Sequence, residues 1–596
     1  MAEAKKSGGY RKILDIRQWL YKETGVQGLY LQLWSLLSVL FTLLVMILIP
    51  RAGILIAGLL HLGGHVALQL WTAKASTSKY RFSPKSFFTS KKLINYAAFV
   101  QFCYHSIALV LAWSASRIGD LPYYLLYAGN ALIVLSYAPV YFTLNSKKNQ
   151  VDRGIMEVVS KNGRKKYRPL NVYRGFFPGL LSWVDALVWA SAVVIFINSL
   201  VFQLYQIPSE SMVPELYVGS RVFTVKTFTN PEIPLSLVRI PVTAGINRFD
   251  QYVISNPRFN YKKEEVLKDF LHNFLYMISF TLIKNPKLDQ YGEVIADPLI
   301  KRLIGLPGEQ LMMVDDTVYV RSRDGGDFRK LAGDELHAYN FSTNVVADAR
   351  RIERPVINPV VKKAVLDWDT QKNEAEALLS AKTQRWLSYF DQLPELWQRY
   401  EYDPARLPRA VLSNLSFSIE ANTIFSDKIM AAYLYWALSD NANFMRELEG
   451  FLTGWKASAG PSSLYQDNAL HTNLLFKYKF MEALEAFSES FFPESNANWQ
   501  EPVRELNSCT QTYIQYYFDW RNFAPFPADD FLLEGEYFLM GDNRYNSIDF
   551  RHWDHHDSRI RPLYAKDAYS LLYSSYQKLF TLEESRIKGK ALFSVF

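Results

Sequence analysis

Two serines and a lysine are the residues of this sequence whose types and spacing could carry out a hydrolysis. Ser209 and Ser211 lie in the stretch IPSESMVPEL, residues 207–216. In an extended chain, positions i and i+2 share one face, so the two hydroxyls would lie together. A serine hydroxyl is a weak nucleophile and needs a base. A polar linker without chemistry would explain the same ten residues, so the stretch alone leaves both interpretations open.

Lys301, in LIKRLIGLPGE (299–309), is available as a base. Lysine is normally protonated at neutral pH, but burial in apolar surroundings disfavours the charged form and lowers its pKa. Alternation along a strand would send Lys301 and Arg302 to opposite faces. The apolar neighbours of Lys301 are Leu299, Ile300, Leu303 and Ile304. Taken alone, this stretch would be interpreted as a strand with Lys301 on the surface.

The composition indicates a chain of several domains with its apolar residues clustered. It has 596 residues, of which 49% are hydrophobic and 15% aromatic, yet the mean hydropathy is −0.07. The net charge of +8 is concentrated in the first third, which favours contact with a membrane surface over nucleic acid, and no nucleic-acid motif is present. Cys103 and Cys509 lie far apart, and we expect no disulfide between them.

Five apolar stretches are candidate membrane spans. Lysine and arginine are abundant in residues 1–33, 72–95 and 144–174, whereas the loops between contain one each, Arg51 and Arg117. This alternation predicts a cytoplasmic N-terminus and places everything after about residue 204 outside the cytoplasm. The first apolar run starts late and further spans follow it, so we expect no cleaved signal. The candidate spans are 34–50, 52–71, 96–113, 121–143 and 177–203.

Four ionisable residues fall inside these spans. His61 and His65 are four apart and share a helix face, while His105 and Asp185 lie in other spans. Such groups are functional candidates by default, and the three histidines could form a haem or metal site. We favour hydrogen bonds between helices, with Asp185 as a further partner.

The outer region alternates in the manner of strands and contains two insertions. Strands are expected at 220–228, 251–256, 299–309, 310–320 and 536–544, with a Gly-Leu-Pro-Gly turn at 305–308 and a hairpin turn at Asp315-Asp316. Residues 340–525 have helical periodicity. A smaller insertion, 258–290, contains an apolar segment at 270–283, for which an interfacial or membrane-facing helix is preferred over a core helix.

The predicted fold is therefore a multi-pass α-helical membrane region followed by a mostly β domain with a large α-helical insertion. The predicted domains are 1–203 (membrane region), 204–339 (first part of the β domain, with the small insertion 258–290), 340–525 (helical insertion) and 526–596 (second part and C-terminal tail).

Three stretches together resemble the bacterial type I signal peptidase, or leader peptidase, family: IPSESMVPEL, IKRLIGLPGE and GDNRYNSIDFR (541–551). NRFDQYVISNP (247–257) is similar to an intervening strand motif of that family. The resemblance covers 204–257, 291–325 and 530–565, roughly a quarter of the chain. The order of the motifs and their position after an apolar stretch carry the resemblance.

The resemblance implies a role for each matching residue. Ser211 attacks the scissile carbonyl, Lys301 is the general base, and the Ser209 hydroxyl with the Ser211 backbone N–H holds the oxyanion. Ser547 would orient the lysine, and Gly541 would leave room for it.

Further matching residues would support the site or line the substrate pockets. Asp549 and Arg551 match a charged pair, although Asp549 could instead form a surface salt bridge. In an extended stretch these two residues and Ser547 would share a face. Apolar residues at pocket positions, each of which could be plain core, are Tyr205, Ile207, Met212, Leu216 and Ile300.

The resemblance implies a membrane-bound serine endopeptidase of the bacterial inner membrane, with its catalytic domain on the periplasmic side. It would remove signal peptides from exported preproteins after small residues, as in Ala-X-Ala sites, without a cofactor or metal. Expected partners are preprotein signal peptides, the lipid bilayer and, as a further candidate, the translocation machinery; no nucleic acid is expected. Two alternatives stay open: a catalytically silent scaffold that binds preproteins or translocation machinery, and a peptidase specialised for few substrates.

The chain departs from the family pattern at four positions. Glu210 and Phe249 stand where glycine is common, Glu215 stands where threonine is common, and Asp554 replaces a glycine. These changes affect details of the pocket more than the chemistry. Asp554 and the nearby histidines could suggest a metal site, but a solvated loop is favoured because no ligand spacing here is diagnostic.

Overall fold

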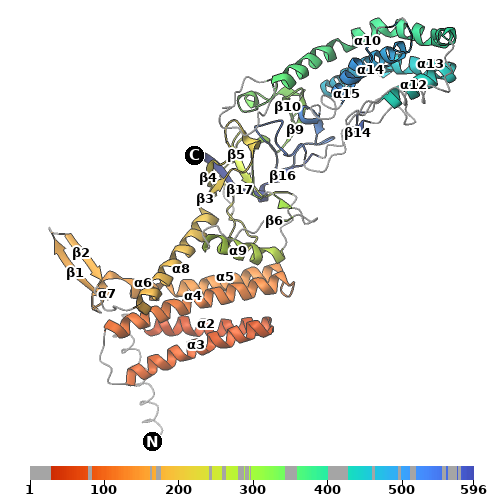
Figure 1. Cartoon of the computed structure of the whole chain (residues 1–596). Coiled ribbons are helices and arrows are strands. Elements are labelled where there is room, and N and C mark those ends of the chain that lie inside the picture. The colour runs from red at the N-terminus through yellow and green to blue at the C-terminus, as the bar shows by residue number, and fades with distance from the viewer. Residues whose placement is uncertain are drawn as a thin grey trace. The chain divides into compact units, whose positions relative to one another are not determined.

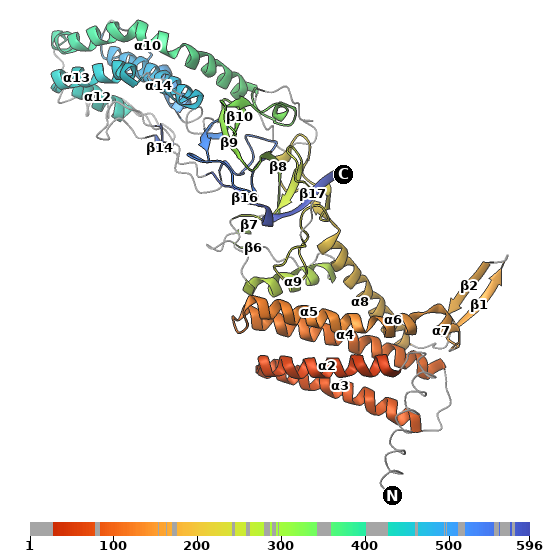
Figure 2. The same cartoon turned by 180° about the vertical axis from the view of Figure 1, so that it is seen from behind.

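The computed structural model of the chain describes residues 28–595 with gaps at 78–83, 153, 162–163, 170–175, 241–244, 258–262, 279–286, 289–293, 296, 343–358, 401–426, 459–462, 494, 496–497, 511–518, 553–558, 561–572 and 575–578. The chain divides into two compact units, whose elements are labelled in Figures 1 and 2. The helical unit comprises 1–201, 231–241 and 258–295. The sheet unit comprises 202–230, 242–257 and 296–596.

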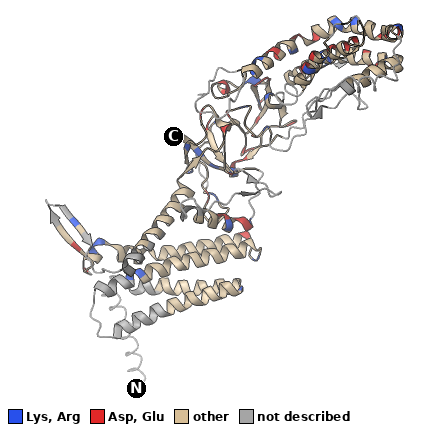
Figure 3. Ribbon diagram, in the orientation of Figure 1, with Lys and Arg blue, Asp and Glu red and all other residues tan. Residues whose placement is uncertain are grey.

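The helical unit is built from apolar helices in which charged residues are few, as Figure 3 shows for the described residues. Several large apolar side chains of these helices are exposed, among them Leu36, Leu40 and Ile47. The helices are α2 (Gly28–Leu48), α3 (Ala52–Thr77), α4 (Pro84–Ser114), α5 (Asp120–Ser136), α6 (Ala138–Asn145), α7 (Lys147–Asp152) and α8 (Phe176–Leu200).

All five predicted spans coincide with helices, but a five-span membrane region is not confirmed. Among the described residues, two helical stretches are long and apolar enough to cross a membrane, Lys91–Ser114 and Asp120–Asn145. The apolar stretches Leu33–Leu48 and Ala52–Val66 are shorter. Two such helices are a weak indication of membrane association, and the predicted orientation stays a prediction.

Helix α9 (Lys263–Ile278) contains part of the predicted apolar segment 270–283, and it packs on α4. Its Val266 and Leu267 lie in one apolar cluster with Trp113 and Tyr123. Lys263 near the start of α9 forms an ion pair with Asp120. The amphipathic helix thus buries one side against the bundle of its own unit. The helical unit also contains the strand pairs β1 (Met156–Lys161) with β2 (Arg164–Pro169), and β6 (Lys287–Leu288) with β7 (Val294–Ile295).

His65 and His105 form the predicted hydrogen bonds between helices, whereas His61 Nε2 has no hydrogen-bond partner among the described residues. The Ser35 hydroxyl lies 3.1 Å from His65 Nδ1, and the Thr42 hydroxyl lies 2.8 Å from His105 Nε2. His105 Nδ1 lies 3.2 Å from Asn130 Oδ1. Within the described part of the chain, no group of three or more histidine, cysteine or acidic side chains could hold a metal ion. The side chain of Asp185 lies outside the described residues.

The sheet unit contains a seven-stranded antiparallel sheet in which β8 is an interior strand. The strand order is β16-β13-β8-β5-β17-β4-β3, so β8 is hydrogen-bonded to β5 on one side and β13 on the other. Figure 2 labels β8 and β17 in this sheet. The strands are β3 (Phe202–Gln206), β4 (Arg221–Val225), β5 (Gln251–Ile254), β8 (Leu299–Gly305), β13 (Glu536–Met540), β16 (Leu582–Glu583) and β17 (Ile587–Val595).

A second, four-stranded sheet follows β8 directly and has the order β11-β10-β9-β12. The predicted turn between β8 and β9 is present, with Gly308 at a φ of +79°. The predicted hairpin turn is present as well, because Asp315 and Asp316 both have positive φ, as a tight hairpin between twisted strands requires. The strands are β9 (Glu309–Val314), β10 (Thr317–Ser322), β11 (Arg329–Lys330) and β12 (Phe523–Phe526); the pair β14 (Arg559–Ile560) and β15 (Tyr573–Ser574) stands apart from both sheets.

The predicted helical insertion is present between β11 and β12. Its long helix α10 buries residues three or four positions apart, such as Leu379, Thr383, Trp386 and Phe390, which form a stripe against α14. Helix α14 begins with a capping box formed by Ser463 and Gln466. The helices are α10 (Pro359–Arg399), α12 (Asp427–Ser439), α13 (Asn441–Thr453), α14 (Leu464–Glu489), α15 (Gln500–Ser508) and the short α16 (Asp519–Arg521).

Candidate active site

Ser211 lies in a short 3-10 turn, Glu210–Met212, rather than in the extended chain that the sequence predicted. Ser209 precedes the turn in an extended conformation. The backbone of this turn, and not strand alternation, therefore determines the direction of each side chain. The two hydroxyls still lie near each other, with the Ser209 hydroxyl 3.4 Å from Ser211 Oγ. Ser209 is exposed and Ser211 is buried.

Lys301 lies in the middle of β8, and its Nζ donates a hydrogen bond of 2.9 Å to Ser211 Oγ. Only 2% of Lys301 is exposed. Burial lowers its pKa to about 8, while the negative charges of Asp549 and Asp542 act in the opposite direction and Arg551 adds to the lowering. A lysine with this pKa is neutral in an appreciable fraction of molecules near physiological pH. The surface interpretation of Lys301 is therefore wrong.

Arg302, the next residue of β8, makes separate contacts, as strand alternation predicted. Its guanidinium donates to both carboxylate oxygens of Asp542, at 2.6 Å each, and also bonds Glu215. Asp542 is fully buried, so the bidentate pair compensates two charges that water cannot reach. The sequence reasoning did not single out Asp542, although it stands next to Gly541 in the third motif.

Asp549 and Arg551 form a fully buried ion pair, so the surface alternative for Asp549 is wrong. Arg551 Nε and Nη2 donate to the two carboxylate oxygens at 2.9 Å each, and neither side chain is exposed. Burial alone would raise the pKa of Asp549, but the charge and hydrogen bonds of Arg551 outweigh it and lower that pKa. The Gly541 backbone N–H also donates to Asp549, at 2.8 Å. The carboxylate is thus held ionised near Lys301.

Ser547 and Gly541 lie close to the dyad but differ from the prediction in detail. The Ser547 hydroxyl is buried and makes no hydrogen bond to the residues that the structure describes, so the expected bond to Lys301 is absent. A Cβ on Gly541 would lie 2.0 Å from Ser547 Oγ and 2.6 Å from the Ser211 carbonyl oxygen. The missing side chain therefore makes room for these two atoms, and its predicted role of leaving room for Lys301 stays a prediction. Residues 547–551 form a loop without strand pairing, in which Ile548 is exposed between buried neighbours.

Four of the five residues predicted to line the substrate pockets pack together in one apolar cluster, and Tyr205 is not part of it. Ile207, Met212 and Leu216 belong to one apolar cluster, and Ile300 packs against it from β8. The first three are at most 3% exposed, so in this structure they form a buried wall, whereas Ile300 and Tyr205 are half-buried. Their role as pocket residues stays a prediction.

Phe249 shows why glycine suits its position. It has a φ of +66°, in the left-handed region where a side chain costs about 1–2 kcal/mol. Its backbone N–H donates to the Leu303 carbonyl at 2.8 Å, and its carbonyl accepts from Arg302, so the conformation is held from two sides. Among the remaining departures, the Glu210 carboxylate accepts from Asn546 at 3.3 Å. Asp554 lies outside the described residues.

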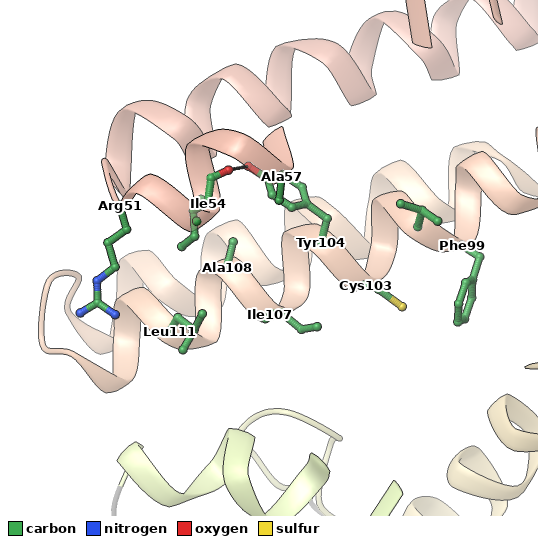
Figure 4. A pocket seen from close by; sticks show the side chains of 11 residues that line it. Arg51, Ile54, Ala57, Phe99, Cys103, Tyr104, Ile107, Ala108 and Leu111 are labelled. Carbon is green, nitrogen blue, oxygen red and sulfur yellow. Dashed lines mark hydrogen bonds between the residues drawn. The ribbon is translucent and has the colours of Figure 1, made fainter. Parts of the chain in front are cut away.

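An apolar groove of about 540 Å³ lies in the helical unit between α3 and α4, and Figure 4 shows the side chains that line it. The Tyr104 hydroxyl donates to the Ile54 carbonyl at 3.1 Å inside it, and Arg51 lies at one end. None of the predicted catalytic residues contributes to it.

The comparison with protein families decides the assignment. The family model described as "Signal peptidase, peptidase S26" matches residues 180–352, which contain Ser209, Ser211 and Lys301. Residues 180–352 are thus similar to the signal peptidase family, and the match supports a type I signal peptidase. The matched family consists of serine hydrolases that remove signal peptides from preproteins, which supports the same general activity for this enzyme. The search of curated proteins found no match, and neither did the search of solved structures.

Proposed function

We propose that this signal peptidase cleaves the peptide bond with Ser211 as nucleophile and Lys301 as general base. The observation that carries the proposal is the 2.9 Å contact between Lys301 Nζ and Ser211 Oγ in a buried setting that lowers the lysine pKa to about 8. The distance lies within the range over which a base can take a hydroxyl proton. Neutral Lys301 accepts the proton of Ser211 as Oγ forms a bond to the scissile carbonyl carbon.

The negative charge that develops on the carbonyl oxygen would be stabilised by the Ser209 hydroxyl and the Ser211 backbone N–H. The 3.4 Å separation of the two hydroxyls places Ser209 beside the reacting atom. When the intermediate collapses, the C–N bond breaks and protonated Lys301 gives its proton to the leaving amine. The lysine, neutral again, takes a proton from the water molecule that attacks the acyl-serine ester. As the ester bond breaks, Lys301 returns this proton to Ser211 Oγ, and the signal peptide leaves as a free acid.

Cleavage after small side chains, as in Ala-X-Ala sites, is the proposed specificity. The apolar cluster of Ile207, Met212 and Leu216, which includes the residue next to Ser211, supports this proposal. We further propose that the helical unit holds the enzyme in the inner membrane with the sheet unit on the periplasmic side. The two long apolar helices support membrane association, and the distribution of lysine and arginine supports the orientation.

The test is cleavage of a purified preprotein with an Ala-X-Ala site by the full chain in detergent, with the cleaved bond identified by mass spectrometry. Ser211→Ala and Lys301→Ala should abolish cleavage, whereas the matched controls Ser585→Ala and Lys330→Ala, both at exposed positions, should cleave like the wild type. Cleavage that survives in folded Lys301→Ala would refute the assignment of the base. Binding without cleavage by the wild type would favour the scaffold alternative, and cleavage of only a few preproteins would favour a specialised peptidase.

A further inference from the structure

The end of the helical insertion is tied to the β domain through one buried arginine. Arg521 is 1% exposed and lies where the insertion returns to the sheet at β12. Its Nη1 and Nη2 donate to the two carboxylate oxygens of Asp369 on α10, at 3.0 and 2.9 Å. Its Nε donates to Asp316 in the β9–β10 turn at 3.0 Å. A guanidinium bound by two carboxylates from separate elements fixes those elements relative to each other.

The residue before Arg521 contacts the ion pair of the active site directly. The Trp520 carbonyl accepts a hydrogen bond of 2.5 Å from Arg551 Nη1. The Arg551 side chain donates its other hydrogen bonds to Asp549 and to the Arg544 carbonyl. The position of Arg551, and with it the charge balance around Lys301, therefore depends on the position of the return segment 519–521.

The start of the insertion also contacts the loop 541–551, which contains Asp549 and Arg551. The Phe341 backbone N–H donates to the Tyr545 hydroxyl at 2.5 Å, and the two rings lie 4.1 Å apart between centroids. The Tyr339 N–H donates to the Asp542 carbonyl at 2.8 Å, and the Arg544 N–H donates to the Tyr339 carbonyl at 3.1 Å. Both ends of the insertion thus bind residues of the loop 541–551, which carries Asp549.

We propose that Arg521 is a positioning residue for the hydrolysis: clamped by Asp369, it holds the return segment so that Arg551 stays paired with Asp549 beside Lys301. The inference rests on the proposed roles of Ser211 and Lys301. It makes the helical insertion a support of the active site, in addition to any role in substrate access or partner binding.

The proposal predicts a specific change in the pH dependence of the reaction. Among the described residues, the charged groups that act on Lys301 are Asp549, Asp542 and Arg551, and Asp542 is itself paired with Arg302. If the clamp loosens and Arg551 withdraws, the negative charge of Asp549 is less compensated. Lys301 then binds its proton more tightly, and the neutral base forms only at higher pH.

The experiment compares Asp369→Asn with the control Arg385→Gln across pH, using kcat/KM for the preprotein. Arg385 also pairs α10 with α14, through Glu485 at 2.9 Å, but it is 62% exposed and far along the helix from Asp369. Asp369→Asn should lower kcat/KM about five- to tenfold at pH 7 and by less than about twofold at pH 10, since one pKa unit corresponds to a tenfold change. The control should follow the wild-type profile.

A uniform loss at every pH, or an unchanged profile in folded Asp369→Asn, would overturn the proposal. Arg521→Lys keeps the buried charge but loses the bidentate contact, so it provides a second variant with the same expected direction. Hydrogen exchange of the Gly541 and Arg551 amides, both of which donate to Asp549, should become faster in either variant and stay unchanged in the control. Failure of the proposed function is seen separately, as absent cleavage by the wild type.

Discussion

The pH dependence of catalysis is the most direct consequence of the buried dyad. Lys301 acts as a base only when neutral, and desolvation by burial lowers its pKa to about 8, against the opposing effect of Asp549 and Asp542. The rate should therefore be maximal above this pKa and fall as the pH decreases through it. About half of the molecules have the neutral lysine at pH 8, about one in ten at pH 7 and about one in a hundred at pH 6.

The assay is kcat/KM for a fluorogenic peptide with an Ala-X-Ala site, measured with the full chain in detergent from pH 6 to pH 10. The logarithm of kcat/KM should rise with a slope of about one per pH unit up to about pH 8 and then level off. Background hydrolysis is measured with Ser211→Ala, and the fold is checked by thermal unfolding at each pH. A rate that stays constant between pH 9 and pH 6 in the folded protein would refute Lys301 as the base.

Two further changes test the energetics of the site. Lys301→Met should abolish cleavage yet stabilise the fold by up to about 3 kcal/mol at pH 7, because a pKa lowered from 10.5 to about 8 reports an unfavourably buried charge. The Lys301 pKa is lower in the folded state, so the unfolded chain binds more protons than the folded chain between about pH 8 and pH 10.5. The cost of the buried charge therefore decreases as the pH rises through this window, and above it Lys301→Met should have no higher free energy of unfolding in denaturant than the wild type. A large destabilisation of Lys301→Met at pH 7 would contradict this. Gly541→Ala should lower kcat/KM about 100-fold or more, because the added Cβ would lie 2.0 Å from Ser547 Oγ and displace the Ser211 carbonyl. Gly535→Ala is the control: no atom lies within 4 Å of its added Cβ, but the φ of Gly535 is +78°. This control should lower stability and leave kcat/KM of the folded enzyme unchanged.

Local features of the β domain were predictable from sequence because each depends on neighbouring residues. Gly308 and the Asp315-Asp316 pair adopt positive φ in the predicted turns, and period-two alternation separates Lys301 from Arg302. The helical insertion was predictable from its periodicity over long segments. The motifs around Ser211 and Lys301 also pointed to the pair, although 90 residues separate them.

Other features depend on contacts between distant segments and could not be read from local pattern. The sequence predicted Ser211 in an extended chain, whereas a 3-10 turn places it, and it predicted a bond from Ser547 to Lys301 that the structure does not contain. Membrane crossing by five helices stays unconfirmed, because apolar composition alone does not separate a span from a packed helix.

What the sequence by itself determined is the chemistry available: a serine, a lysine with apolar neighbours, and a family whose motifs contain both. What only the tertiary structure decided is the environment of that lysine. Pairing of β8 with β5 and β13 buries Lys301, and the loop after β13 brings Asp549 and Arg551 to it. The return of the insertion then places the Trp520 carbonyl against Arg551. The physical reason is that burial and electrostatic interaction depend on distance in space, which strand pairing sets between segments far apart in the chain.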